Sequence, residues 1–271
     1  YVVELARQLG LHPEVERVDL LTRLIEDERI DRSYAQREEP LGPGARIVRL
    51  PCGPKRYIRK ELLWPHLDEL VDNCLLFIRQ QGQLPDLIHS HYADAGYVGQ
   101  QLSGILGVPL IHTGHSLGRP KRERLLASGR KASAIERQFN LAQRIAVEED
   151  LLTHATMIVT STRQEVEEQY GLYDNYSHGR FEVIPPGTDT SRFTPRTSAK
   201  GSHLSLPFID RFLREPGKPM VLALCRPDPR KNINGLITAF GEDKELQARA
   251  NLVLVAGNRD DIDAMDSSSA R

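Results

Sequence analysis

Several cations of this sequence lie where an apolar run gives way to a polar turn. Lys60 opens the predicted helix at the end of "RYIRK", Lys121 follows the predicted strand 108–116, and Arg144 lies in "LAQRIAVEE", on a predicted helix that could pack nearby. Cations that converge near helix N-termini would hold a phosphate group, because backbone N–H groups and the helix dipole add to the side-chain charges. The competing interpretation is that they are ordinary solvated cations, since 36 of the 271 residues are lysine or arginine.

Three histidines, His89, His91 and His115, stand at the ends of predicted strands. Such a group could indicate a metal site, but no HExxH motif and no His-x-His pair with an acid in context accompanies it. We therefore expect no metal, and we expect His91 and His115 to orient a polar ligand by hydrogen bonds. The alternative is that they are buried histidines satisfied within the protein.

A second group of cations lies in "RPDPRKN", which joins a predicted strand to a predicted helix. Arg226 and Lys231 flank two prolines that stiffen this turn, an arrangement that suits a diphosphate over the helix N-terminus. The turn is not a P-loop, because the glycines of that motif are absent. The acidic run "NRDDID" (258–263) resembles a metal-binding loop, but we expect it to be a solvated loop.

Composition excludes several classes of protein. The net charge of −1 gives no basic field for nucleic acid. Three cysteines, Cys52, Cys74 and Cys225, form no CxxC pair, which favours reduced thiols in a cytoplasmic protein. No apolar run approaches the roughly 18 residues of a membrane span, and no signal peptide opens the chain. Nothing in the sequence indicates an oligomeric state.

Strand-like and helix-like segments alternate, which predicts parallel sheets covered by helices on both faces. Predicted strands cover residues 17–22, 46–51, 86–92, 108–116, 157–162, 181–187, 219–225 and 251–257. Predicted helices cover residues 1–10, 60–82, 93–107, 132–153, 162–173 and 232–242. Such sheets bind ligands beyond the carboxyl ends of their strands. The polar ends of strands 86–92 and 108–116 should therefore face a ligand.

The pattern predicts two α/β domains. The first covers residues 1–187, a Pro-, Gly- and Ser-rich connection covers 188–215, and a second domain begins at 216 and runs to 271. The first helix has no N-cap before it, and the last strand has barely ended when the chain stops. We therefore expect a fragment cut at both ends, with the second domain incomplete.

Nine stretches together resemble the sucrose-phosphate synthase family of retaining glycosyltransferases, along almost the whole chain. The most specific are "HYADAG", "TGHSLGR" and "RPDPRKN". The resemblance implies the GT-B arrangement of two Rossmann-like domains, here truncated at both ends. It also implies transfer of glucose from UDP-glucose to fructose 6-phosphate with retention, which gives sucrose 6-phosphate and UDP. No cofactor or metal would be required.

Matched motif by motif, the resemblance assigns roles to the residues above. Lys60, Lys121 and Arg144 would hold fructose 6-phosphate, and we place His91 in the same acceptor site. His115 would lie beside the transferred glucose and act in catalysis. On the donor side, the resemblance assigns Arg226 and Lys231 to the diphosphate of UDP.

Two motifs of the family are absent from the 271 residues. A glycine-glycine-glutamine turn would precede Tyr1, and an acidic motif that holds the donor sugar would follow Arg271. We therefore expect this exact chain to be inactive. Two alternatives stay open: a related transferase with another sugar or sugar-phosphate acceptor, and a non-catalytic module that binds a sugar phosphate. Free fructose is a disfavoured acceptor, because the three cations argue for a phosphorylated one.

Overall fold

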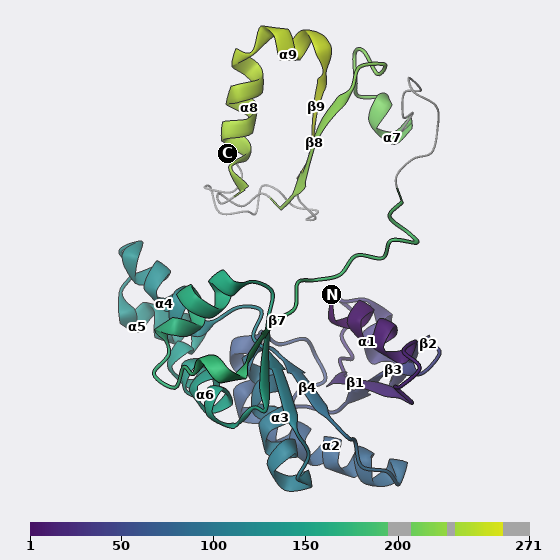
Figure 1. Cartoon of the computed structure of the whole chain (residues 1–271), viewed down its shortest axis with the longest axis vertical. Helices are drawn as coiled ribbons and strands as arrows, with labels where there is room; N and C mark the ends of the chain where they lie inside the picture. The colour runs from purple at the N-terminus through teal and green to yellow at the C-terminus, as the bar shows by residue number, and fades with distance from the viewer. Residues whose placement is uncertain (195–206, 227–230, 257–271) are drawn as a thin grey trace. The chain divides into compact units, whose positions relative to one another are not determined.

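The computed structural model describes residues 1–194, 207–226 and 231–256, and it divides the chain into two compact units (Figure 1). Unit 1 comprises Tyr1–Thr188 and unit 2 comprises Asp189–Arg271. The division falls next to residue 187, where the sequence pattern placed the end of the first domain.

Unit 1 begins with a three-stranded sheet of order β1-β3-β2. Strands β1 (Val18–Arg23) and β3 (Ala45–Leu50) are parallel, whereas β2 (Glu38–Gly42) is antiparallel to β3. Helix α1 (Val2–Gly10) inserts Ala6 against one face of this sheet. The other face of β3 packs on α2 (Leu67–Gln81) through a core that includes Val48, Leu50 and Cys74.

The second sheet of unit 1 is fully parallel and has the order β4-β5-β6-β7. Its strands are β4 (Ile88–His91), β5 (Leu110–Thr113), β6 (Met157–Thr160) and β7 (Phe181–Val183). Helix α3 (Tyr92–Leu106) connects β4 to β5 and ends at Gly107, which has the left-handed conformation that glycine favours. Because β4 and β5 pair in parallel, His91 lies beside Thr113 at the carboxyl edge.

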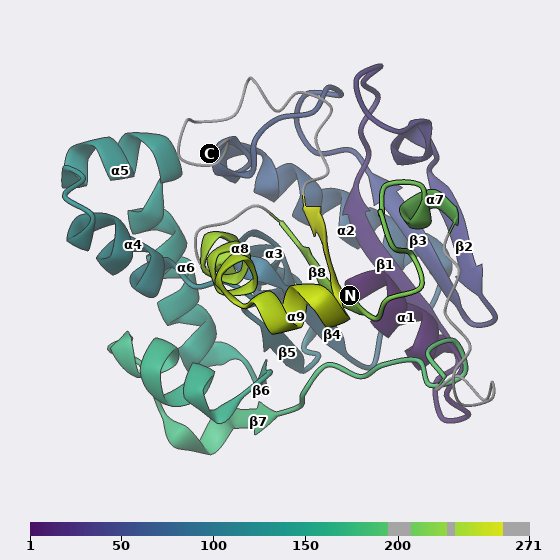
Figure 2. The same ribbon diagram turned by 90° about the horizontal axis from the view of Figure 1, so that it is seen from above.

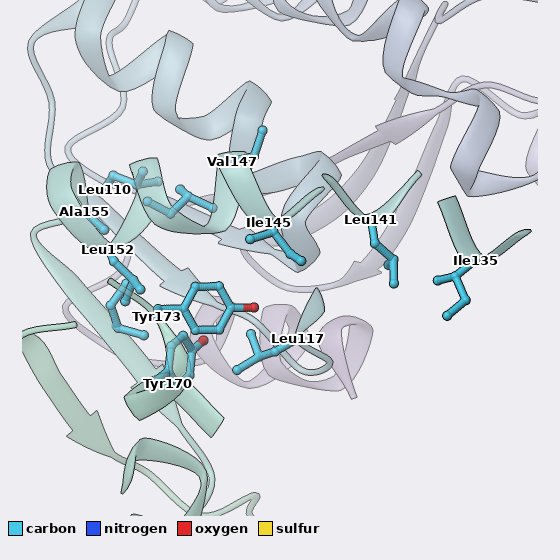
Figure 3. Close-up of a cluster of buried hydrophobic side chains, with 12 residues drawn as sticks. Leu110, Leu117, Ile135, Leu141, Ile145, Val147, Leu152, Ala155, Tyr170 and Tyr173 are labelled. Atoms are coloured by element: carbon cyan, nitrogen blue, oxygen red, sulfur yellow. The ribbon is translucent and has the colours of Figure 1, made fainter. Parts of the chain in front are cut away.

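Three helices connect β5 to β6: α4 (Gly118–Ala127), α5 (Ala132–Phe139) and α6 (Leu141–His154). Figure 2 shows them grouped at one side of unit 1. Their core comprises buried residues from β5, the turn after it, α5, α6, β6 and the segment 170–173 (Figure 3). Leu117, Leu141 and Ile158 are almost fully buried there, so this core fixes the turn that carries His115.

Most predicted elements form, but four predictions need correction. The predicted helix 60–82 begins as two 3₁₀ turns, Lys60–Leu62 and Trp64–His66, because Pro65 has no N–H for an α-helical hydrogen bond. The predicted helix 132–153 is two helices, divided at Asn140 with φ 47°. The predicted helix 162–173 is a π-helical turn, Glu165–Gln169, followed by a 3₁₀ turn, Tyr170–Leu172. The first sheet is mixed rather than parallel, since β2 is antiparallel.

Unit 2 contains a parallel pair of strands, β8 (Met220–Cys225) and β9 (Asn251–Ala256). Helices α8 (Ile233–Glu242) and α9 (Lys244–Arg249) connect them, so these elements form the predicted βαβ arrangement. A short helix, α7 (Pro207–Asp210), lies within the segment predicted as a connection. Minor 3₁₀ turns in unit 1 cover Arg32–Ala35 and His178–Arg180.

Candidate functional site

The carboxyl edge of the β4-β5 pair carries two residues in a strained backbone conformation. Tyr92 has φ 70° and His115 has φ 57°, and neither is a glycine. Such positions cost on the order of 1–3 kcal/mol and cluster at functional sites. Tyr92 directly follows β4, and His115 lies two residues after β5. The strain thus falls on both strand ends that the sequence predicted to face a ligand.

A pocket of about 210 Å³ lies at this edge and brings the three predicted acceptor cations together. Its lining combines cations, carboxylates and aromatic rings: Lys60, Glu61, Trp64, Tyr92, Ala93, Asp94, Lys121, Phe139 and Arg144. These residues come from the 60–66 turns, the start of α3, α4, the end of α5 and α6. A pocket of this mixed character suits a small ligand that is both anionic and rich in hydroxyl groups.

The charges of the pocket act on one another. Partial burial lowers the pKa of Lys121, and the positive charges of Lys60 and Arg144 lower it further. The ammonium of Lys121 lies 3.8 Å from the centre of the Phe139 ring, a cation–π contact that holds it in place. A bound phosphate would relieve the repulsion between the three cations, and this electrostatic gain favours an anionic ligand in the pocket.

Arg144 is buried and is also part of the framework of the site. Its Nε donates to Glu148 one turn further along α6, at 2.8 Å, and its guanidinium donates to the backbone carbonyl of Ser116. Glu148 also accepts the backbone N–H of Gly118 at 2.9 Å and the hydroxyl of Tyr173. A side chain at position 118 would place its Cβ 2.8 Å from Glu148, so glycine is needed there.

Two neighbours of Lys121 on α4 have other surroundings. Arg119 forms ion pairs with Glu149 and Asp174, and its guanidinium lies over the ring of Tyr173. The positive charge of Arg119 is therefore balanced by carboxylates of the protein itself. Arg122 does not belong to the lining of the pocket, although it adjoins Lys121 in the sequence.

His91 and His115 form a hydrogen-bonded pair. Nδ1 of His91 lies 2.9 Å from Nε2 of His115, and the ring centroids are 5.1 Å apart. The ring of Tyr92 packs beside His115 at 4.7 Å. Burial lowers the pKa of His91 to about 3 and also lowers the pKa of His115. Both imidazoles are therefore neutral at neutral pH.

Two further histidines support this pair from within the sheet. His89 bonds the hydroxyl of Thr113, and His112 bonds the hydroxyl of Ser90, each at 2.9 Å. Burial lowers the pKa of His89 to about 4 and that of His112 to about 3. Among the described residues, no group of three or more histidine, cysteine and acidic side chains could hold a metal ion.

In unit 2, Arg226 follows β8 directly and Lys231 precedes α8. Both side chains are exposed. The predicted pair thus lies at the carboxyl end of a parallel strand and the start of a helix, as the sequence indicated. The acidic run 258–263 lies outside the described residues. Within residues 1–194, 207–226 and 231–256, no helix is long and apolar enough to cross a membrane.

Only Lys60, Lys121 and Arg144 of the lining had an assigned role; the sequence analysis gave none to Glu61, Trp64, Tyr92, Ala93, Asp94 and Phe139. Asp94 had a signal, because it lies at the start of the predicted helix 93–107, directly after the polar end of strand 86–92. Phe139 had none. It enters the pocket because the chain breaks at Asn140, and the predicted continuous helix would have continued through that position.

A family model and the curated relatives both connect this chain to glycosyltransferases. Residues 1–187 match the glycosyl transferase 4-like domain. Probable sucrose-phosphate synthase 1 of Oryza sativa subsp. indica is 44% identical, over 100% of this chain and 30% of the relative. The chain therefore spans about a third of the length of the curated relatives it matches.

Two solved structures establish the fold class. Sucrose-phosphate synthase from Thermosynechococcus elongatus is 28% identical with a TM-score of 0.66, over 95% of this chain and 57% of that one. Anabaena HepE in complex with UDP and glucose is 16% identical with a TM-score of 0.53, over 93% and 56%. The α/β architecture predicted from the sequence is confirmed as that of the GT-B glycosyltransferases. Since the domain match spans residues 1–187, the chain belongs to the glycosyl transferase 4-like family.

Proposed function

We propose that this chain provides the acceptor site of a sucrose-phosphate synthase, which transfers glucose from UDP-glucose to fructose 6-phosphate with retention. The observation that carries the proposal is the pocket in which Lys60, Lys121 and Arg144 converge. Its three cations fit a phosphate, and its two carboxylates and aromatic rings fit the hydroxyls and faces of a sugar. The 44% identity to rice sucrose-phosphate synthase supports the same assignment.

In this proposal the acceptor is anchored by its phosphate. Arg144 is held in position by its ion pair with Glu148 and would offer N–H groups of its guanidinium, whereas Lys60 and Lys121 bring positive charges from separate segments. Anchoring the phosphate at three points orients the sugar hydroxyl that attacks, which is a positioning effect on the rate. A neutral sugar would leave the mutual repulsion of the cations unrelieved and would bind more weakly.

The proposed donor chemistry uses the other predicted residues. Retaining transfer passes through a sugar with oxocarbenium character, while negative charge grows on the leaving diphosphate. Arg226 and Lys231 would stabilise that charge, and His115 would contact the transferred glucose. The leaving phosphate itself would take the proton of the attacking hydroxyl.

The chain offers a direct test of the acceptor site, because its single tryptophan, Trp64, lines the pocket. Titration with fructose 6-phosphate should change the Trp64 fluorescence saturably, and fructose should bind at least about tenfold more weakly. Lys121→Ala should weaken fructose 6-phosphate binding by about tenfold or more. Arg122→Ala, one residue away but outside the lining, is the matched control. Equal affinity for fructose and its phosphate would refute the proposed acceptor.

A further inference from the structure

The position of His91 does not match a direct role in the acceptor pocket. Its neighbours in the sequence, Tyr92, Ala93 and Asp94, all line that pocket, but His91 does not. Its ring instead lies against His115, with Nδ1 2.9 Å from Nε2 of that residue. The side chain of His91 thus contacts the histidine that would face the donor sugar.

The hydrogen bond between the two rings restricts where their protons lie. Because burial keeps both imidazoles neutral, each ring carries one proton, and one ring must donate while the other accepts. If His115 donates through Nε2–H, both rings are in the Nε2–H form, which is the more stable tautomer of free histidine. If His91 donates through Nδ1–H, both rings must adopt the less stable Nδ1–H form. The first arrangement is therefore favoured.

The surroundings leave His115 little freedom to change this arrangement. Its backbone is held in the left-handed region at φ 57°, between β5 and the turn that Arg144 fixes through Ser116. Tyr92 packs beside its ring at 4.7 Å, and His91 holds its Nε2 edge. Nδ1 is then the nitrogen of His115 that has no hydrogen bond within the described part of the chain.

We propose that His91 is a positioning residue for His115. His91 accepts the Nε2–H of His115 through its Nδ1 and so holds His115 in the tautomer whose Nδ1 has a free lone pair. That lone pair accepts a hydrogen bond from a hydroxyl group of the transferred sugar. The role in sugar recognition rests on the proposed function, whereas the tautomer does not.

The tautomer can be measured on the 271-residue chain, because long-range ¹H–¹⁵N correlation spectra distinguish protonated from unprotonated ring nitrogens. His115 should show a protonated Nε2 and an unprotonated Nδ1. His91→Ala should change that pattern. His91→Asn should restore it, since the asparagine carbonyl oxygen can occupy the place of Nδ1. His89→Asn, which alters the other histidine of β4, should leave the His115 signals unchanged.

A second measurement separates this role from contact with the acceptor. His91→Ala and His91→Asn should bind fructose 6-phosphate within about twofold of the unaltered chain, by Trp64 fluorescence. Three results would overturn the proposal: an Nδ1–H tautomer of His115, His115 signals unchanged in His91→Ala, or a loss of fructose 6-phosphate affinity as large as in Lys121→Ala. If the unaltered chain fails to bind fructose 6-phosphate, the proposed function fails, and the spectra still decide the role of His91.

Discussion

At the residue scale, the fold controls the charge state of four histidines around the β4 and β5 ends. Burial is the main cause in each case, and the charge that any one would gain on protonation also raises the cost for its neighbours. A neutral histidine can serve as a specific donor or acceptor of one hydrogen bond. The same arrangement makes the site sensitive to acid, because all of these rings must be neutral in the folded state.

The stability of the folded chain should fall as the pH is lowered. The folded pKa values of His89, His91 and His112 lie at about 3 to 4, below the ordinary value of 6.5. As the pH falls below 6.5, the unfolded chain takes up protons that the folded chain does not, so stability present above that pH is lost progressively down to about 3. Thermal unfolding followed from pH 8 to pH 5 should show a falling midpoint.

His112→Gln should make that midpoint depend less on pH, since His112 is the most deeply buried of the three. The exposed His12→Gln variant serves as the control and should retain the slope of the unaltered chain. A slope in His112→Gln equal to that of the unaltered chain would show that other groups cause the acid sensitivity.

At the element scale, α6 supports the site through Glu148. This carboxylate is 3% exposed and accepts hydrogen bonds from Arg144, Gly118 and Tyr173, so it joins α6, the start of α4 and the segment after β6. Removing one partner of a buried ion pair is costly because the other charge stays buried. These contacts place Arg144 relative to the start of α4 and the segment after β6.

Glu148→Gln should therefore lower the free energy of unfolding by about 3 kcal/mol, measured by urea denaturation, because Arg144 loses its counter-charge. It should also weaken fructose 6-phosphate binding, since Glu148 would no longer hold the Arg144 guanidinium against the start of α4 at Gly118. Glu167→Gln, an exposed site in the segment after β6, should change neither quantity appreciably. A loss below about 1 kcal/mol would mean that water compensates the arginine.

The elements also show which features the sequence could predict. Apolar periodicity predicted α3, with Gly107 as its end, because one face is buried and the left-handed cap requires glycine. Periodicity did not predict the break at Asn140, since the apolar pattern runs through it. Edge strand β2 was missed because Pro40 and Gly42 weaken its strand pattern, and an edge position tolerates both. The identity of the acceptor cations came from motif resemblance, but Glu148, the buried partner of Arg144, required the structure.

At the scale of the whole molecule, the proposed contacts to the acceptor phosphate and to the donor diphosphate belong to different units. Lys60, Lys121, Arg144 and the histidines lie in unit 1, whereas Arg226 and Lys231 lie in unit 2. Unit 1 has two sheets and the described part of unit 2 has one, and His91 and Arg226 lie at or directly after the carboxyl ends of parallel strands. This arrangement follows the general rule for ligand binding in open α/β sheets. It implies that losing one of these phosphate contacts should affect one ligand.

The separation can be tested by measuring two affinities on the same set of variants. Arg226→Ala should weaken UDP binding by about tenfold, because a charged contact to the diphosphate is lost, and should leave fructose 6-phosphate binding unchanged. Lys121→Ala should do the reverse. Isothermal titration of the 271-residue chain with each ligand separately measures both effects, and Lys244→Ala on α9 controls for loss of an unrelated cation in unit 2. If either variant weakened both ligands equally, the two sites would not be independent, and the assignment of Arg226 and Lys121 to separate ligands would be wrong.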